Sequence, residues 1–176
     1  MTARVAFLRA VNLGKRRVAM VRLKAVCENL GYTAVFTHIN SGNVVFDAPG
    51  SRESVESAME KACETEFGFE CTTFVRSATE LEKVVADRPF DVAGSDTHFV
   101  TFLKTVPTAA QRSALEGLSN DYETLVVRGR DVHWLMHGKS SDSKLTKRDW
   151  EKILGTNTST SRNTTMLRKL VARLPS

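Results

Sequence analysis

The sequence predicts an α+β sandwich of two ferredoxin-like halves of the β-α-β-β-α-β type, the second incomplete, with a C-terminal helical segment. Two observations carry this prediction. Short apolar runs rich in β-branched and aromatic residues alternate with stretches whose apolar residues recur every three or four positions. Capping-box spacings and glycines mark the ends of several of these stretches, and turn-forming residues separate the short runs.

The first half has the element order β-α-β-β-α-β between residues 4 and 76. Its first helix has Met20, Leu23, Val26, Cys27 and Leu30 at helical spacing, and Gly31 is placed for a left-handed C-terminal cap. Ser51 opens the second helix, whose apolar face carries Val55, Met59, Cys63 and Phe67. The turn at residues 40–42 has the composition Asn-Ser-Gly, which predicts a hairpin. The predicted strands are residues 5–9, 35–39, 43–47 and 72–75.

The second half starts in the same order but shows no clear fourth strand. A helix opened by Ser77 and Glu80 leads into it and ends at Arg88-Pro89. The predicted elements are a strand at 98–103, a helix at 107–118 with Thr108 and Gln111 at capping-box spacing, strands at 124–127 and 132–136, a helix capped by Thr146 with Asp149 three residues later, and a last helix from Asn163. We expect residues 1–88 to form the first half and residues 98–176 the second half with the C-terminal helices, packed as one compact unit.

The composition is ordinary for a soluble globular protein, with 41% apolar and 26% charged residues. No apolar run approaches the roughly 20 residues that span a bilayer, and no secretory signal is visible, so we expect a cytoplasmic protein with no membrane partner. Cys27, Cys63 and Cys71 are odd in number and lack CxxC spacing, which indicates neither a disulfide framework nor a zinc site. We expect no metal and no cofactor.

Charge is distributed unevenly along the chain. Residues 1–27 hold seven Lys or Arg and no acid, residues 28–138 have a net charge of −8, and residues 139–176 have a net charge of +6. If the two basic ends meet in space, they form one positive surface. The cations assigned to that surface are Lys15, Arg16, Arg17, Lys139, Arg168 and Lys169.

Arg9, Asn12 and Gly14 lie in the loop between the first strand and the first helix. A glycine-containing loop with cations before a helix is a suitable seat for an anion, because its backbone N–H groups and the helix N-terminus attract negative charge. The loop lacks both GxGxxG and GxxxxGK[ST], so it is no known phosphate fingerprint. The alternative is a tight turn with solvated arginines.

Ser41, Gly42 and Asn43 offer a hydroxyl and an amide at the hairpin tip. A nucleophilic serine needs a base within reach, and His38 is the only histidine nearby in sequence. Turn chemistry alone also explains these residue types, and no catalytic motif is recognisable. His133 and His137 are expected to face solvent from one strand, opposite an apolar stripe.

Ser161-Arg162-Asn163 is the most suggestive polar cluster. Asn163 is suited to cap the last helix, which leaves Arg162 beside the positive helix end, where Lys144 and Arg9 could help it hold a phosphate or carboxylate. Plain helix capping is the alternative.

The segments "AFLRAVNLG", "THINSGNVVF", "RPF", "GKSSDSKL" and "SRN" followed by "RKL" occur in an order that resembles the bacterial "domain of unknown function 1697" family. The resemblance covers nearly the whole chain. It implies two ferredoxin-like halves with a C-terminal segment and no established activity. Thr164 and Met166 stand where the family usually has Trp and Thr.

Two functions follow as hypotheses. In the first, the basic surface binds an anionic ligand, nucleic acid without sequence specificity. In the second, the chain is a small-ligand protein or an enzyme for a phosphorylated or carboxylated metabolite. The predicted anion-binding residues are Arg9, Asn12, Gly14, Ser41, Gly42, Asn43, Lys144, Arg162 and Asn163.

Overall fold

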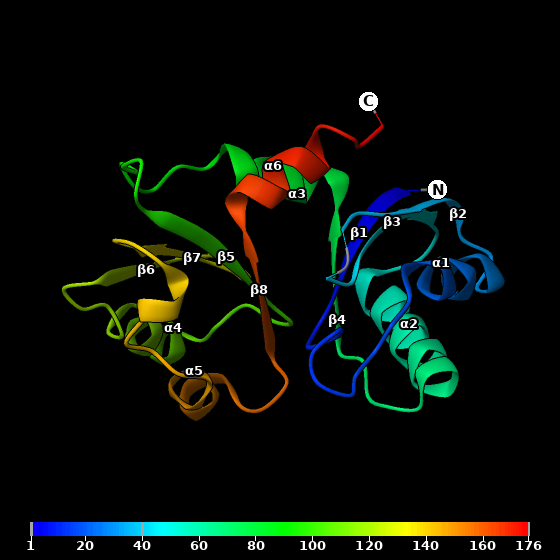
Figure 1. The fold of residues 1–176 in the computed structure, drawn as a ribbon, viewed down its shortest axis with the longest axis horizontal. Coiled ribbons are helices and arrows are strands. Elements are labelled where there is room, and N and C mark those ends of the chain that lie inside the picture. Colours follow the sequence, from blue (N-terminus) through cyan, green and yellow to red (C-terminus); the bar gives the residue numbers. More distant parts are fainter. Residues whose placement is uncertain (1, 40, 176) are drawn as a thin grey trace. The chain divides into compact units, whose positions relative to one another are not determined.

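The structure is a computed structural model that describes residues 2–39 and 41–175. The chain divides into two compact units. Unit 1 comprises Met1–Lys83 with Leu170–Ser176, and unit 2 comprises Val84–Lys169. Helices α3 (Ala78–Ala86) and α6 (Thr164–Val171) each have residues in both units (Figure 1).

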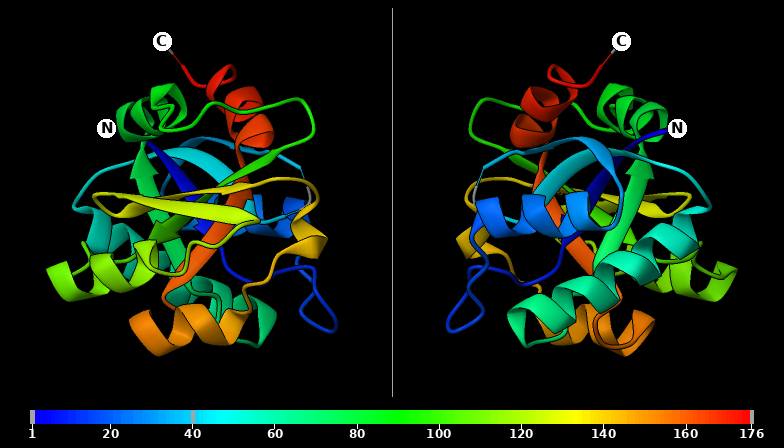
Figure 2. Two further views of the ribbon diagram at one scale, coloured as in Figure 1. Left: turned by 90° about the vertical axis from the view of Figure 1, so that its left-hand side faces the viewer. Right: turned by 90° about the vertical axis from the view of Figure 1, so that its right-hand side faces the viewer.

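Unit 1 is an antiparallel sheet with two helices on one face. Its elements are β1 (Thr2–Leu8), α1 (Met20–Asn29), β2 (Thr33–Thr37), β3 (Asn43–Ala48), α2 (Arg52–Phe67) and β4 (Thr73–Ser77). The strands lie in the order β2-β3-β1-β4. The right-hand view of Figure 2 looks onto α1 and α2 in front of this sheet. The predicted β-α-β-β-α-β order of the first half is confirmed.

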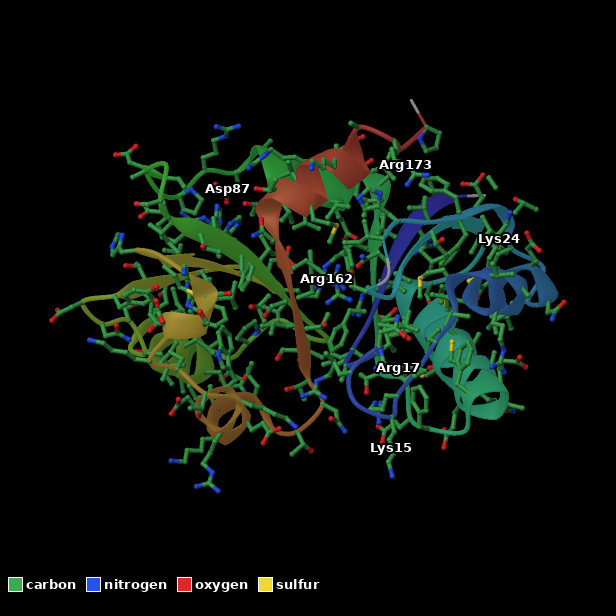
Figure 3. All side chains as sticks on the ribbon, in the orientation of Figure 1. Lys15, Arg17, Lys24, Asp87, Arg162 and Arg173 are labelled. Carbon is green, nitrogen blue, oxygen red and sulfur yellow. The ribbon has the colours of Figure 1, made fainter. Side chains whose placement is uncertain are left out.

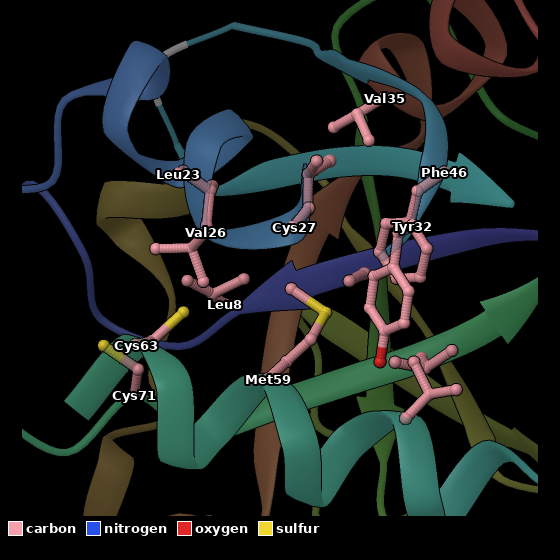
Figure 4. Close-up of a cluster of buried hydrophobic side chains, with 14 of the residues drawn as sticks. Leu8, Leu23, Val26, Cys27, Tyr32, Val35, Phe46, Met59, Cys63 and Cys71 are labelled. Carbon is pink, nitrogen blue, oxygen red and sulfur yellow. The ribbon is translucent and has the colours of Figure 1, made fainter. Parts of the chain in front are cut away.

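The core of unit 1 fills the space between this sheet and its helices. Leu23 and Cys27 from α1 and Met59 from α2 are fully buried in the same cluster as Phe46 from β3. Tyr32 stacks on Phe46 with ring centroids 4.7 Å apart (Figure 4). Leu23, Cys27 and Met59 are residues that the helical spacing assigned to the apolar faces, so the periodicity identified the helical part of this core correctly.

Unit 2 repeats the architecture. Its elements are β5 (Thr97–Leu103), α4 (Ala109–Glu116), β6 (Glu123–Arg128), β7 (Asp131–Met136), the 3₁₀ turn η1 (Ser140–Asp142), α5 (Lys147–Leu154) and β8 (Ser159–Asn163). The antiparallel strands lie in the order β6-β7-β5-β8, which matches the order in unit 1. The predicted α+β class is confirmed.

Strand β8 corrects the prediction that the second half is incomplete. The segment reads STSRN and pairs with β5 at the edge of the sheet, from Phe99↔Asn163 to Leu103↔Ser159. An edge strand has one neighbour only, and its residues need no apolar alternation, so this strand carries no signal that sequence periodicity detects.

The helix ends follow the predicted caps. Thr108 with Gln111 and Thr146 with Asp149 form capping boxes at the starts of α4 and α5. Trp150 in α5 belongs to the hydrophobic core of unit 2, and its ring centroid lies 5.4 Å from that of Trp134. Within residues 2–39 and 41–175, no helix has both the length and the apolar character that crossing a membrane requires.

Candidate anion-binding loop and the predicted site residues

The loop between β1 and α1 is held by its own hydrogen bonds. Asn12 Oδ1 accepts from the Val18 amide at 2.9 Å, and the Asn12 amide donates to the Arg16 carbonyl at 2.6 Å. Ala10, Asn12 and Gly14 all have positive φ, at 55°, 58° and 55°. Left-handed residues at alternate positions belong to the backbone pattern from which anion-binding nests are made.

The tip of this loop has unused hydrogen-bond donors. Gly14 and Lys15 are exposed, and their amides donate to no acceptor in the part of the chain that the structure describes. A Cβ atom added to Gly14 would meet nothing within 4 Å, so the space above the tip is open. Backbone N–H groups in this arrangement are available to an anion.

The side chains of Lys15 and Arg17 extend from the same loop (Figure 3). Both side chains are exposed, and neither forms an ion pair with any described residue. Within the described residues, the Arg17 side chain makes a single long contact, of 3.5 Å from Nη1 to the Asn12 carbonyl. Within the described residues, the tip of the loop therefore presents two cationic side chains without an ion-pair partner and two backbone amides without a hydrogen-bond acceptor.

Arg16 has a different role from its neighbours. Its Nε donates to the Ala10 carbonyl at 3.0 Å, its Nη2 donates to the Glu70 carbonyl, and its guanidinium lies 4.6 Å above the centre of the Phe69 ring. This side chain fastens the loop to the segment after α2, so it is not available at the surface in the way that Lys15 is.

The hairpin residues lie against the same loop. Gly42 has φ of 77°, and its carbonyl accepts from the Leu8 amide at 2.9 Å. A Cβ atom at Gly42 would lie 2.5 Å from Val11 Cγ2, so only glycine lets the hairpin approach the loop this closely. The structure thus brings Gly42 next to the loop that holds Arg9, Asn12 and Gly14.

Turn chemistry accounts for Ser41 and Asn43. Asn43 is fully buried, and its Nδ2 donates to the His38 carbonyl at 3.0 Å and to Ser41 Oγ at 2.8 Å. The His38 ring lies against a cation, with Nδ1 2.9 Å from Arg173 Nη1. The remaining turn residue, Asn40, lies outside the described residues. Arg9 is half-buried at the end of β1, where its amide donates to the Thr72 carbonyl.

The remaining candidates belong to unit 2. Asn163 Oδ1 accepts from the Thr165 amide at 2.8 Å at the start of α6, as the predicted cap requires. Arg162 donates through Nη1 to Thr160 Oγ1 at 2.7 Å, and burial lowers the pKa of its guanidinium to about 10. The backbone of Lys144 is bound at the β6 edge of the sheet, whereas Arg162 lies on β8 at the opposite edge. The structure does not bring these two backbone positions together.

The buried carboxylate of Glu123 holds the "GKSSDSKL" segment in place. Glu123 is fully buried and accepts from Ser143 Oγ, the Lys144 amide at 2.9 Å, Trp134 Nε1 at 3.0 Å and Asn120 Nδ2 at 3.1 Å. Burial opposes ionisation, but these hydrogen bonds outweigh it and hold the pKa of Glu123 below its usual value. The segment is thus anchored to the sheet, with the Lys139 and Lys144 side chains exposed.

The prediction that His133 faces solvent is wrong. This residue is 1% exposed, and its Nδ1 lies 2.9 Å from Nε2 of the buried His98. Asp87 Oδ2 lies 3.7 Å from His133 Nε2 and 3.3 Å from Arg128 Nε. Burial, with smaller contributions from His133 and a nearby arginine, lowers the pKa of His98 to about 4.

The reason for the error is the pairing register. Val100 lies opposite His133 and His98 lies opposite Leu135, so the two histidines are diagonal neighbours on one face of the sheet. Sequence periodicity shows that His133 faces away from Trp134, but it does not show what lies on the other face. His137 is exposed, as predicted. Among the described residues, no three His, Cys, Asp or Glu side chains have an arrangement that could hold a metal ion.

Comparisons with known proteins place the chain in a family. The model of the family described as "Protein of unknown function (DUF1697)" matches residues 1–133. The solved structure of a conserved bacterial protein from Streptococcus pneumoniae is similar over 98% of this chain and 97% of that chain, with a TM-score of 0.80 and 22% sequence identity. At this identity the likeness bears on the fold. The search of curated proteins finds no significant match. Since the family model covers well over half of the sequence, the chain belongs to the family described as "Protein of unknown function (DUF1697)".

Proposed function

We propose that this protein binds polyanions, nucleic acid without sequence specificity, and that the loop between β1 and α1 holds one phosphate group. The observation that carries the proposal is the tip of the loop, where the Gly14 and Lys15 amides have no acceptor within the described residues and the Lys15 and Arg17 cations have no ion-pair partner there. A phosphate oxygen accepts hydrogen bonds from such amides, and the two cations neutralise its charge.

The rigidity of the loop supports this function. Asn12 and Arg16 fix the backbone through hydrogen bonds to Val18, Ala10 and Glu70. A site whose donors are already in place loses less conformational entropy on binding than one that must be ordered by its ligand. Lys15 and Arg17 then supply charge that does not depend on base sequence.

Unit 2 offers further cations for the same class of ligand. Lys139, Lys144, Arg168 and Lys169 have exposed side chains, and Asn163 lies at the start of α6 beside Arg162. Each exposed cation that neutralises a phosphate adds about 0.9 to the slope of log affinity against log salt on duplex DNA. Binding without sequence specificity is supported by the make-up of the loop, which presents amides and charges but no exposed aromatic ring for base stacking. The cytoplasmic location that we expect for this protein fits such a ligand.

The experiment is a salt titration of binding to a labelled mixed-sequence oligonucleotide, measured by fluorescence anisotropy. We expect log affinity to fall linearly with log salt, and the double substitution Lys15→Ala with Arg17→Ala to reduce the slope by about one to two units. Lys24→Ala is the matched control, because Lys24 is an exposed cation on α1 whose Nζ lies 3.8 Å from Glu28 Oε1. An unchanged slope in the double variant contradicts the proposal.

The alternative function is binding of a small phosphorylated or carboxylated metabolite. A thermal-shift screen of such compounds distinguishes the two, because a ligand at 100 times its Kd adds roughly 2.7 kcal/mol to stability. A large shift with one metabolite, together with an oligonucleotide affinity that Lys15→Ala does not change, favours the small-ligand function.

A further inference from the structure

Two of the three cysteines of the chain meet in unit 1. Cys63 lies in the last turns of α2, and Cys71 lies in the connection to β4. The thiol of Cys63 donates a hydrogen bond to the sulfur of Cys71. Figure 4 shows the two sulfur atoms beside each other, while Cys27 lies apart on α1. The pair has no CxxC spacing, so its sequence gives no sign of it.

The backbone between Cys63 and Cys71 reverses direction and brings the two residues together. Gly68 ends α2 with φ of 79°, a left-handed conformation that reverses the direction of the chain. Phe69 then stacks on Phe67 with ring centroids 6.3 Å apart. Thr73 holds the segment after Cys71 against α2. Its amide donates to Glu60 Oε1 at 3.0 Å, and its hydroxyl donates to the Cys71 carbonyl at 3.0 Å. These contacts keep Cys71 next to Cys63.

One member of the pair borders a cavity. A cavity of about 360 Å³ reaches Cys71 but not Cys63. It is lined by Ser57, Glu60, Lys61, Glu64, Glu70, Cys71 and Thr72. Cys71 is 1% exposed and Cys63 is 0% exposed, so a small reagent in this cavity reaches the pair at Cys71 before Cys63.

We propose that Cys71 and Cys63 are a reactive thiol pair that hydrogen peroxide, entering through this cavity, converts to a disulfide. The Cys71 sulfur, as thiolate, attacks one peroxide oxygen, the O–O bond breaks, and the departing hydroxide takes up the proton that the Cys71 thiol released on ionising and leaves as water. Cys71 is then a sulfenic acid. The Cys63 sulfur attacks the Cys71 sulfur, the S–O bond breaks, and the hydroxide leaves as a second water with the Cys63 proton. The two thiols lose two electrons and two protons, and the peroxide is reduced to two waters.

The electrostatics assign the two sulfurs their roles. The hydrogen bond from Cys63, and the nearby Arg16 guanidinium, lower the pKa of the Cys71 thiol although burial acts against them. The same hydrogen bond, together with burial, raises the pKa of Cys63. The thiolate is the nucleophile, so Cys71 is the attacking group and Cys63 the resolving one.

The cavity also selects the oxidant by charge. Glu60, Glu64 and Glu70 line it, against one lysine, Lys61. Three carboxylates repel an anionic disulfide and attract a cationic one. We therefore expect cystamine, a cationic disulfide, to modify Cys71 faster than oxidised glutathione, an anionic one.

The test uses the full native chain. The protein is treated with hydrogen peroxide, its remaining thiols are alkylated after unfolding, and its peptides are mapped by mass spectrometry. We expect two of the three thiols to be lost, a peptide pair linked through Cys63 and Cys71, and Cys27 alkylated in full. The absence of the linked pair, or oxidation of Cys27 at the same rate as Cys71, overturns the proposal.

Variants separate the two roles. Cys63→Ala removes the resolving thiol, so a dimedone-type reagent is expected to trap sulfenic acid at Cys71. Cys27→Ala is the control and is expected to form the same disulfide as the unmodified sequence. Equal rates with cystamine and oxidised glutathione contradict entry through the acidic cavity. Peptide mapping of the unmodified sequence decides the main point even if a cysteine variant fails to fold.

Discussion

Gly42 and Val11 stand so close that a Cβ atom on Gly42 would lie 2.5 Å from Val11 Cγ2. This contact joins the hairpin after β2 to the loop after β1, and it depends on an absent side chain. The two segments that the sequence singled out are therefore parts of one structure in unit 1.

The first prediction concerns this contact. Gly42→Ala adds a steric clash to a left-handed backbone, and we expect it to lower the free energy of unfolding by about 2–4 kcal/mol. Gly31→Ala is the matched control, because Gly31 also has positive φ, 84°, but its Cβ would meet nothing within 4 Å. Urea denaturation measures both variants. Equal losses in the two would show that backbone strain, not the Val11 contact, requires the glycine at position 42.

The second prediction separates Arg16 from Lys15. Arg16→Ala removes hydrogen bonds to two carbonyl groups and the contact with the Phe69 ring, and we expect a stability loss of about 1–3 kcal/mol. Lys15→Ala removes an exposed side chain, and its stability should stay within about 0.5 kcal/mol of the original. Chemical denaturation of the two variants tests this. A silent Arg16→Ala would mean that the guanidinium does not fasten the loop.

The third prediction concerns Glu123. Glu123→Ala leaves the Trp134 Nε1–H and the Lys144 amide without their acceptor, and each buried donor left unpaired costs about 1–3 kcal/mol. We expect a marked loss of stability and faster amide hydrogen exchange at residues 143–145. Glu116→Ala is a suitable comparison, because Glu116 is a half-exposed carboxylate that accepts from a single amide, that of Val127. Unchanged exchange at residues 143–145 would contradict the role of Glu123 as their anchor.

The fourth prediction is a pH dependence caused by the buried histidine pair. The pKa of His98 is about 4 in the folded chain, below the ordinary value of 6.5, so the unfolded chain takes up the proton first as the pH falls. The stabilising contribution is complete above pH 6.5 and is lost as the pH falls toward 4. We expect Tm to fall between pH 8 and 5.5, where unperturbed carboxyl groups stay ionised.

Two variants test whether the buried histidine pair causes that pH dependence. His98→Gln should reduce the fall in Tm between pH 8 and 5.5. His137→Gln should leave it unchanged, because His137 is exposed, although its Nδ1 lies 3.5 Å from Asp96 Oδ1. If His137→Gln flattens the profile and His98→Gln does not, the buried pair is not its source.

Much of the fold could be predicted because local signals were strong. The caps at Ser51, Thr108 and Thr146 mark helix starts that the structure has within a residue or two, and helical spacing identified Met59 as core. Strand β8 escaped because its residues, STSRN, carry no apolar alternation at the edge of the sheet. Local sequence fixes such elements only where burial imposes a period.

The site was less predictable, because its chemistry depends on contacts between distant residues. Arg16 looked like its neighbours Lys15 and Arg17 until its bond to the Glu70 carbonyl showed a structural role. His98 and His133 meet through a strand register that no local pattern specifies. Thr164, at a position where the family resemblance implies Trp, donates to the His98 carbonyl at 3.0 Å.

The proposal that the loop between β1 and α1 binds phosphate is tested most directly by NMR. In a titration of ¹⁵N-labelled protein with a short mixed-sequence oligonucleotide, we expect the amide resonances of Gly14 and Lys15 to shift in proportion to bound ligand. Gly31 and Gly68, which also have positive φ but lie at helix ends, should keep their resonances. Unmoved Gly14 and Lys15 resonances at saturating oligonucleotide would contradict the account.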